Sequence, residues 1–123
     1  MAKGYKVKSL ALKVETGDTS GRSFLATWAF SKSHVSAYKV KFWYKAQTTR
    51  NGKKEYNWIG PSESEVKVKQ ATYSAPDNAI AVKVQVRPVS TKHKVKRGKK
   101  KVEVNYWTGA WCKVVTKNIT TYG

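Results

Sequence analysis

The sequence predicts an all-β protein, a single antiparallel β-sandwich of seven or eight strands. Apolar residues recur at every second position over much of the chain, helical spacing is scarce, and short turn motifs separate the alternating runs. The length of 123 residues suits one domain, so we expect residues 1–123 to form one unit. The 40% hydrophobic content is enough to fill one core.

The first two strands are expected at 5–14 and 22–30, separated by the turn-forming run ETGDTSG. In the first strand the apolar alternation slips by one residue between Val7 and Leu10, which indicates a β-bulge or an edge that twists away. In the second, FLATWAF places every other residue on one face and includes Trp28 among them. We therefore expect Trp28 to lie in the core.

A hairpin is expected next, with strands at 37–46 and 54–60 and a turn at Asn51-Gly52. In YKVKFWYK one face is apolar, and the opposite face carries Trp43 between lysines. A period of two with one apolar face is typical of a half-buried strand.

Four further strands are expected at 64–73, 80–89, 100–107 and 111–119, bounded by turn-forming runs such as SAPDNA and KRGK. β-Branched and aromatic residues are abundant in the chain, as strands favour. One face of each strand should supply alternate residues to the core. The residues expected there are Leu12, Phe24, Ala26, Trp28, Tyr38, Val40, Phe42, Val82, Val84, Val86 and Val104.

Charge is the most unusual property of the chain. Lys and Arg number 25 against seven Asp and Glu, which gives a formal net charge of +18. Such a balance attracts polyanions, whether nucleic acid, anionic lipid headgroups, acidic glycans or an acidic protein surface. Charge alone does not select among them.

Cysteine usage and the N-terminal segment indicate where the protein is made. Cys112 is the single cysteine, so neither an intramolecular disulfide nor a multi-cysteine zinc site is possible within the chain. The run MAKGYKVKSLALKVETG has no apolar stretch long enough for a signal peptide or a membrane helix. We expect synthesis in a reducing cytoplasm and no membrane partner.

The order of three segments resembles a fibronectin type III domain. LATWAF carries Trp28 where that family has its core tryptophan, YKVKFWYK resembles the third strand, and TYSAPDNAIAVKVQVRPVS resembles the fifth and sixth strands with their connection. One departure is Val82, which stands where the family usually has a tyrosine that hydrogen-bonds across a corner. The resemblance implies a fibronectin type III or immunoglobulin-like sandwich.

A narrower resemblance, over roughly residues 10 to 112, is to fibronectin-type domains in bacteriophage tail and other virion proteins. It depends on the order and spacing of ATWAF, YKVKFWY, YNWIG, TYSAPDNAIAVKVQVRPVS and YWTGAW. In that family such domains are mostly accessory modules on the particle surface without enzymatic activity. The resemblance therefore implies a tail or decoration protein that is located in the virion, is present in many copies and has other virion proteins as partners.

Tryptophans among lysines form the first candidate contact surface. Trp43 lies on the lysine-bearing face of its strand, and Trp58 lies in YNWIG. Such rings can stack on bases or sugars, or they can cover a neighbouring protein, because Trp and Tyr are enriched at interfaces. Trp107 and Trp111 are expected to close the edge of the sandwich as packing residues.

The run KHKVKRGKKKVE is the second candidate. Its alternation predicts a hairpin with a tight tip at Arg97-Gly98. Three interpretations are open: sequence-independent contact with phosphates, contact with an acidic protein, or a solvated hairpin whose lysines prevent edge pairing. The cations that would make the contact are Lys92, Lys94, Lys96, Arg97, Lys99, Lys100 and Lys101.

No catalytic, cofactor or metal site is predicted. The two histidines, His34 and His93, lie in basic segments with no carboxylate at a suggestive spacing. Glu63 and Glu65 share a face, but both should point to solvent, and no nucleophile-elbow or phosphate-loop pattern occurs. The favoured function is a non-enzymatic structural or adhesion protein of a phage particle that binds acidic neighbouring proteins. The alternative is a nonspecific polyanion-binding module that acts on nucleic acid or an anionic cell-wall polymer.

Overall fold

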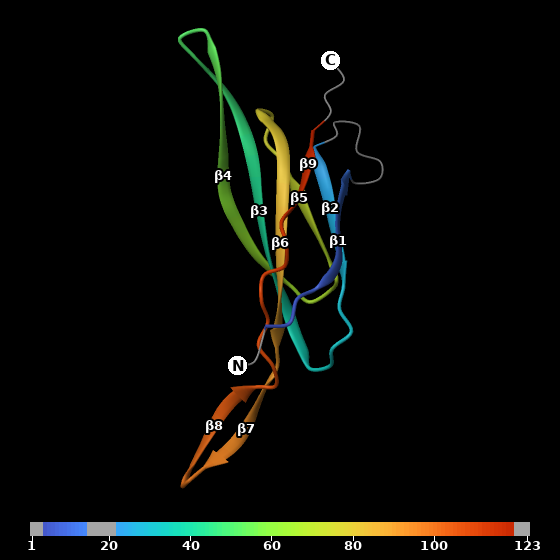
Figure 1. Ribbon diagram of the computed structural model, residues 1–123, viewed down its shortest axis with the longest axis vertical. Coiled ribbons are helices and arrows are strands. Elements are labelled where there is room, and N and C mark those ends of the chain that lie inside the picture. Colours follow the sequence, from blue (N-terminus) through green and yellow to red (C-terminus); the bar gives the residue numbers. More distant parts are fainter. Residues whose placement is uncertain (1–3, 15–21, 120–123) are drawn as a thin grey trace.

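The computed structural model describes residues 4–14 and 22–119, and every regular element in these residues is a β-strand (Figure 1). Seven strands build two packed sheets, of order β1-β2-β5 and β4-β3-β6-β9, while β7 and β8 form a separate two-stranded ribbon. The predicted antiparallel sandwich is confirmed, and the turn expected at 15–21 lies outside the described residues. The strands are β1 Lys8–Val14, β2 Ser23–Ala29, β3 Val35–Arg50, β4 Lys53–Val66, β5 Gln70–Ser74, β6 Ala79–Ser90, β7 Lys92–Arg97, β8 Lys100–Asn105 and β9 Val115–Asn118.

The core lies between the two sheets and is filled by alternate residues of each strand. In β6, Val82, Val84 and Val86 are all fully buried, and they pack against Val40 of β3 and Phe24 of β2. This alternation is the pattern from which the sandwich was predicted.

Every residue expected in the core is buried there except Val104. Val104 belongs to β8 and pairs with His93 in the ribbon, where it is only half-buried. The expectation was wrong because the ribbon extends past the end of the sandwich, so no second sheet covers its apolar side.

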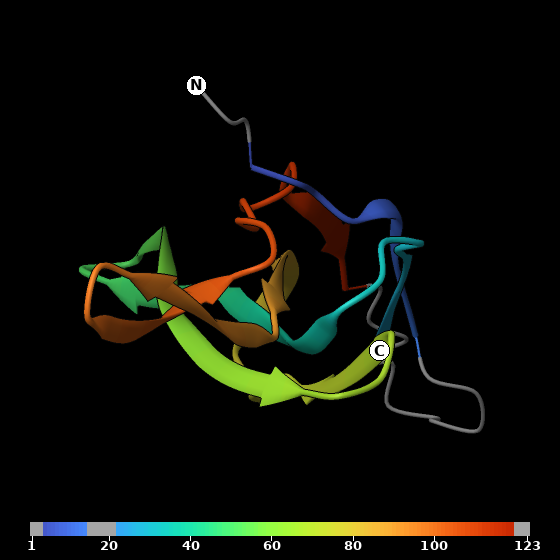
Figure 2. The same cartoon turned by 90° about the horizontal axis from the view of Figure 1, so that it is seen from below.

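The predicted strand at 64–73 was also wrong. β4 continues to Val66, the chain bends at 67–69, and β5 begins at Gln70 on the other sheet. Figure 2, which looks along the molecule from below, shows the chain crossing from the end of β4 to the opposite layer. The boundary was hidden because every residue of β4 before Val66 is exposed, so no apolar alternation marks where the strand ends.

The bulge predicted near the start of the chain is confirmed. The register between β1 and β2 shifts between Lys8 and Ala11, and Ser9 has a φ of 57°. The irregularity allows Val7 and Leu12, which are an odd number of residues apart, to be buried on the same side.

Two hairpins project from opposite ends of the sandwich (Figure 1). At one end, β3 and β4 are joined by Asn51 and Gly52, whose φ angles of 53° and 76° suit the two-residue turn predicted there. At the other end the ribbon of residues 92–105, called the arm below, continues from β6. Its turn consists of Gly98 and Lys99, because Arg97 pairs with Lys100. The tip therefore lies one residue later than predicted.

Trp28 packs in the core as expected. It is 6% exposed, and its ring meets Tyr38 edge-on with 5.4 Å between the ring centroids. Burial raises the pKa of the Tyr38 phenol, so this side chain stays neutral beside the indole. No hydrogen-bond acceptor in the described part of the chain reaches the buried Nε1 of Trp28.

Replacing Trp28 with Ala should lower the free energy of unfolding by about 3–5 kcal/mol, because the change empties a large buried site. Trp28→Phe should cost clearly less, since it leaves a smaller cavity and removes an N–H that is buried without an acceptor. Urea unfolding of the two variants beside the parent measures both effects. A loss below about 1 kcal/mol for the Ala variant would contradict this assignment of the core.

Candidate binding surface: an aromatic and lysine face and a basic arm

Lysines and aromatic rings alternate on the outer face of the four-stranded sheet. Because Val40 and Phe42 of β3 point into the core, the residues between and after them point outward. The same parity applies to β6, in which Val82 and Val84 are buried on either side of Lys83. We call this surface the aromatic–lysine face. It consists of Lys41, Trp43, Lys45, Tyr56, Trp58, Lys83 and Trp111.

Lys83 lies at the centre of this face, between the two tryptophans that the sequence singled out. Its Nζ is 5.1 Å from the ring centroid of Trp43 and 4.3 Å from that of Trp58. Strand register explains the meeting: Trp43 pairs across strands with Lys83, and Trp58 pairs with Lys45 beside them. Trp43 and Trp58 thus come together through a lysine that the sequence analysis did not assign to the site.

Two more lysines lie over rings on either side of this centre. Lys41 Nζ is 4.2 Å from the ring centroid of Trp111, and Lys45 Nζ is 5.4 Å from that of Tyr56. An exposed cation–π contact contributes about 0.5–1 kcal/mol, which is enough to bias a lysine toward one orientation. The face therefore presents its ammonium groups at partly fixed positions.

Gly60 leaves the space that the indole of Trp43 occupies. The register between β3 and β4 shifts between Phe42 and Tyr44, and Gly60 has a φ of 125° at this irregularity. A Cβ at Gly60 would lie 3.0 Å from the carbonyl oxygen of Phe42 and 3.3 Å from Cδ1 of Trp43. Only glycine suits this backbone conformation, and the missing side chain leaves room for the indole.

Two glutamates lie opposite lysines on one part of the sheet. Glu63 pairs across strands with Lys41, and Glu65 pairs with Lys39, and both glutamates are exposed as expected. Opposite charges on facing residues are mildly stabilising. Lys45 and Lys83, beside the tryptophans, have no glutamate as a cross-strand partner.

The arm is a hairpin, as its alternation predicted, and it has two unlike sides. Val95 pairs with Val102 on one side, which is half-buried. Near the tip the facing residues are all cations: Lys96 faces Lys101, and Arg97 faces Lys100. Like charges directly opposite each other destabilise a sheet, so these cations do not serve the stability of the arm.

Three stacked rings hold the root of the arm. Tyr106 lies between His34, with 3.7 Å between ring centroids and 8° between planes, and His93, with 4.1 Å and 29°. His34 belongs to the connection between β2 and β3, whereas His93 belongs to β7. Both histidines of the chain are therefore used to fix the arm against the sandwich.

Hydrogen bonds reinforce this root. The buried Ser90 side chain accepts from the backbone N–H of Tyr106 at 3.0 Å and of Trp107 at 3.4 Å. The indole Nε1 of Trp107 donates to the Ser33 carbonyl oxygen at 2.8 Å. The arm thus leaves the sandwich at a defined angle.

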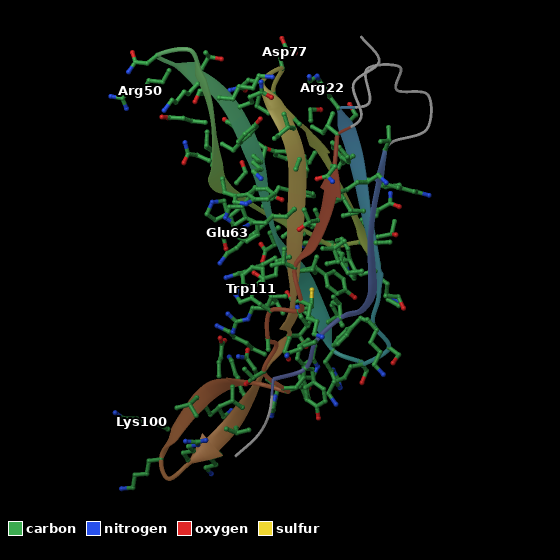
Figure 3. All side chains as sticks on the ribbon, turned by 45° about the horizontal axis from the view of Figure 1, so that its top comes forward. Arg22, Arg50, Glu63, Asp77, Lys100 and Trp111 are labelled. Carbon is green, nitrogen blue, oxygen red and sulfur yellow. The ribbon has the colours of Figure 1, made fainter. Side chains whose placement is uncertain are left out.

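The candidate residues fall into two groups that the structure does not bring together. Figure 3 places Lys100 at the tip of the arm, whereas Trp111 and Glu63 lie beside the body of the sandwich. Trp107 is buried and packs against Phe30, in agreement with the packing role predicted for it, but Trp111 lies on the outer face beneath Lys41. Tyr56 was also missed, although its spacing of two residues from Trp58 was a signal that both share a face.

The described residues show no cluster of side chains that could hold a metal ion. Within 4–14 and 22–119, no group of three His, Cys, Asp or Glu side chains is placed to hold a metal ion. Cys112 is buried, and its Sγ contacts the Lys113 carbonyl oxygen at 3.4 Å. No helix in the described part of the chain is long and apolar enough to cross a bilayer.

Comparison with solved structures identifies the fold. The chain resembles the third fibronectin III domain of the human KIAA0343 protein, with a TM-score of 0.55 over 99% of this chain and 86% of that one. The chain has a fibronectin type III-like fold. At 11% sequence identity this likeness concerns the fold alone. No protein-family model matches the chain, and no curated protein matches its sequence.

In this fibronectin type III-like domain the arm is an insertion between the last two strands of the larger sheet. β6 and β9 pair directly, with Val84 facing Val115, yet residues 91–114 separate them in the chain. Within that connection the 106–112 segment returns along β6, where Cys112 donates its backbone N–H to the Val86 carbonyl at 3.0 Å. The length and sequence of the arm can therefore change without disturbing the pairing of β6 with β9 in the sandwich.

Replacing Lys96, Arg97, Lys99 and Lys100 with Ser should leave the free energy of unfolding unchanged or slightly higher, because like charges that face each other are removed. The same variant should bind duplex DNA or another polyanion more weakly, and its salt dependence should fall by roughly one unit of log–log slope for each cation that contacted a phosphate. Urea unfolding and a binding titration at several salt concentrations measure the two effects. Unfolding of the variant would mean that the tip is packed, and an unchanged salt slope would mean that its cations are only solvated.

Proposed function

We propose that this chain is a non-enzymatic adhesion module, a structural component of a phage tail or particle surface that is present in many copies. The biological setting comes from the resemblance of segments such as ATWAF and YNWIG to virion domains. The mechanism comes from the aromatic–lysine face, which docks on an acidic neighbouring virion protein.

The observation that carries the proposal is the position of Lys83 between Trp43 and Trp58. Tryptophan supplies large contact area at the centre of protein interfaces, and charged pairs around it set orientation and partner choice. A carboxylate of the partner can reach the Lys83 ammonium while an apolar neighbour covers the rings. The exposed fraction of Trp58, 39%, leaves much of its indole free for such a contact.

Multiplicity compensates for weak individual contacts. Exposed cation–carboxylate pairs contribute little each, and the face offers few of them. Copies arranged on a particle gain avidity, because each further contact forms at high effective concentration. The net charge of +18 speeds the first encounter with an acidic surface and discourages the copies from aggregating with one another.

Fractionation of purified phage particles tests this proposal. The chain should co-purify with particles, and Lys83→Gln should reduce its occupancy several-fold because it removes the cation shared by Trp43 and Trp58. Lys117→Gln is the matched control, with the same loss of charge on the neighbouring strand β9 but off the aromatic–lysine face, because Lys117 pairs with the inward Val82. A chain that stays in the infected-cell lysate and never enters particles would refute the proposal.

A nonspecific polyanion-binding module is the second candidate, favoured by the facing cations at the tip of the arm. Duplex-DNA binding across a salt series separates the two functions. With six or more phosphate contacts, affinity should fall roughly a thousandfold or more between about 50 and 200 mM salt. Binding at low salt is expected of any chain with this charge, whereas tight binding at physiological salt would favour the second candidate.

A further inference from the structure

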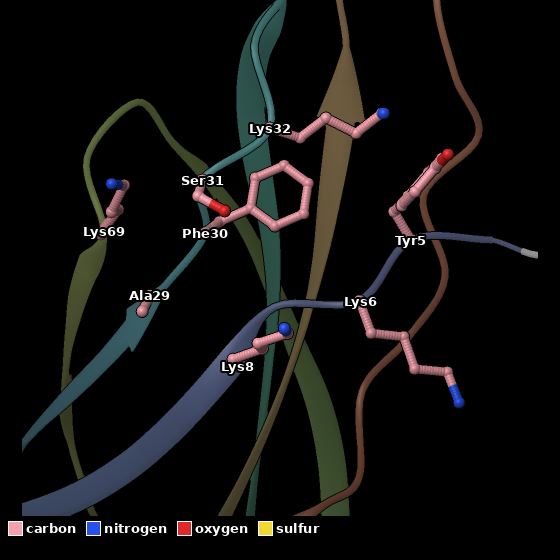
Figure 4. A pocket seen from close by; sticks show the side chains of 8 residues that line it. All are labelled: Tyr5, Lys6, Lys8, Ala29, Phe30, Ser31, Lys32 and Lys69. Atoms are coloured by element: carbon pink, nitrogen blue, oxygen red, sulfur yellow. The ribbon is translucent and has the colours of Figure 1, made fainter.

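We propose that a second surface, a groove beside the start of β1, binds an acidic peptide segment that carries one large apolar side chain. This inference rests on the proposed function in one respect, that the natural partner is an acidic protein, and it assigns a site separate from the aromatic–lysine face. Figure 4 shows the groove. Its volume is about 550 Å³, and it is lined by Tyr5, Lys6, Lys8, Ala29, Phe30, Ser31, Lys32 and Lys69.

The walls of the groove are fixed by the backbone. Tyr5 donates its N–H to the Thr108 carbonyl at 2.8 Å and accepts from the N–H of Ala110 at 2.8 Å. On the other side, the Lys69 carbonyl accepts from the N–H of Trp28 at 3.2 Å. A site whose walls are already held loses little freedom when a ligand binds.

The charge of the groove is of one sign. Four of its lining residues are lysines, and none of those that the structure describes is acidic. In Figure 4 the lysines are spread around Phe30, with Lys32 above it, Lys69 to its left, Lys8 below it, and Lys6 on the right pointing away from the ring. Cations spread in this way match a ligand whose negative charges are spaced along a chain better than one compact anion.

Phe30 gives the groove an apolar floor. Its ring is half-buried against Trp107, with 5.3 Å between centroids, and Tyr38, with 6.2 Å, and its remaining surface faces the groove. Burying an apolar side chain contributes about 25 cal/mol for each Å² removed from water. An apolar residue of the ligand on Phe30 would therefore anchor the acidic residues that flank it.

The rings favour a peptide over single-stranded nucleic acid. A nucleic-acid tract stacks successive bases on several open aromatic faces. Here Lys32 Nζ covers the Tyr5 ring at 4.0 Å, and Tyr5 also meets Trp107 at 6.1 Å in an edge-on contact. The lining that the structure describes therefore holds only two aromatic rings, Tyr5 and Phe30, and a lysine lies over the first of them, which suits one apolar side chain on Phe30 rather than a row of bases.

An NMR titration of the isotope-labelled full chain tests this site, with the end-blocked peptide Glu-Glu-Leu-Glu-Glu as the probe. The amide signals of Lys8, Phe30 and Lys69 should shift on binding. Lys8→Gln combined with Lys69→Gln should weaken binding roughly fivefold, the effect of losing two exposed charge pairs. The control combines Lys13→Gln with Lys117→Gln, which removes equal charge from exposed positions outside the groove and should change affinity less than twofold.

A second peptide with Ala in place of Leu isolates the apolar anchor and should bind roughly tenfold more weakly. Equal affinity for the two peptides, or equal effects of the two double variants, would overturn the proposal. So would a deoxythymidine oligonucleotide of the same charge that shifts the groove signals at lower concentration than the peptide. The outcome of particle fractionation does not depend on these titrations. A failure of the proposed adhesion function and a failure of the proposed peptide-binding groove can therefore be told apart.

Discussion

The pairing of β3 with β6 sets both the core and the outer surface of the larger sheet. Along both strands every second side chain enters the core, and Val40 of β3 faces the equally buried Val86 of β6. The intervening positions point outward, and there the same register sets Trp43 opposite Lys83. A slip of one residue would bury Lys83 and expose its valine neighbours, so the core that stabilises the sheet also assembles the aromatic–lysine face.

Strand length explains the two projections. β3 and β6 are the two central strands of the larger sheet, and the chain continues beyond the sandwich at the end of each. In the described part of the chain no second sheet packs over the residues in these extensions, so strand pairing alone holds them. A two-stranded ribbon is marginal by itself, which makes the stack of His34, Tyr106 and His93 important for holding the arm.

The cations at the tip of the arm and those on the sheet have different physical settings. Lys96 and Lys101 face each other at the tip without a ring beneath them, so repulsion and solvent govern where they point. Lys41 and Lys83 lie over indole rings, which restrict their positions. The sheet therefore presents ammonium groups at defined positions to a partner, whereas the arm contributes mainly long-range electrostatic attraction.

Much of the fold could be predicted from the sequence because burial on one face leaves a period of two. Trp28 and the valines of β6 were placed correctly for this reason. Val104 has the same pattern but lies in the arm, because alternation shows that a strand has one apolar face without showing whether a second sheet covers it. β4 gave no such signal, since nearly all of it is exposed.

The candidate site was only half predictable. Trp43 was found from the lysines on its face and Trp58 from the run YNWIG, but the cation that joins them is Lys83, from a strand distant in sequence. Strand order and register decide which residues of different strands come into contact, and the pattern within one strand gives no information about either. Trp111 was misplaced for the same reason, because the irregular connection after the arm carries it onto the outer face beneath Lys41.

In the proposed mechanism the aromatic–lysine face itself contacts the acidic partner, and the net charge of the chain alone does not produce this contact. The most direct test adds poly-glutamate to isotope-labelled protein and follows the indole N–H signals of its five tryptophans. We expect the signals of Trp43, Trp58 and Trp111 to shift together, whereas those of the buried Trp28 and Trp107 should stay in place. If only arm amides shift while the signals of Trp43 and Trp58 remain still, the aromatic–lysine face is not the contact surface and the proposed mechanism is contradicted.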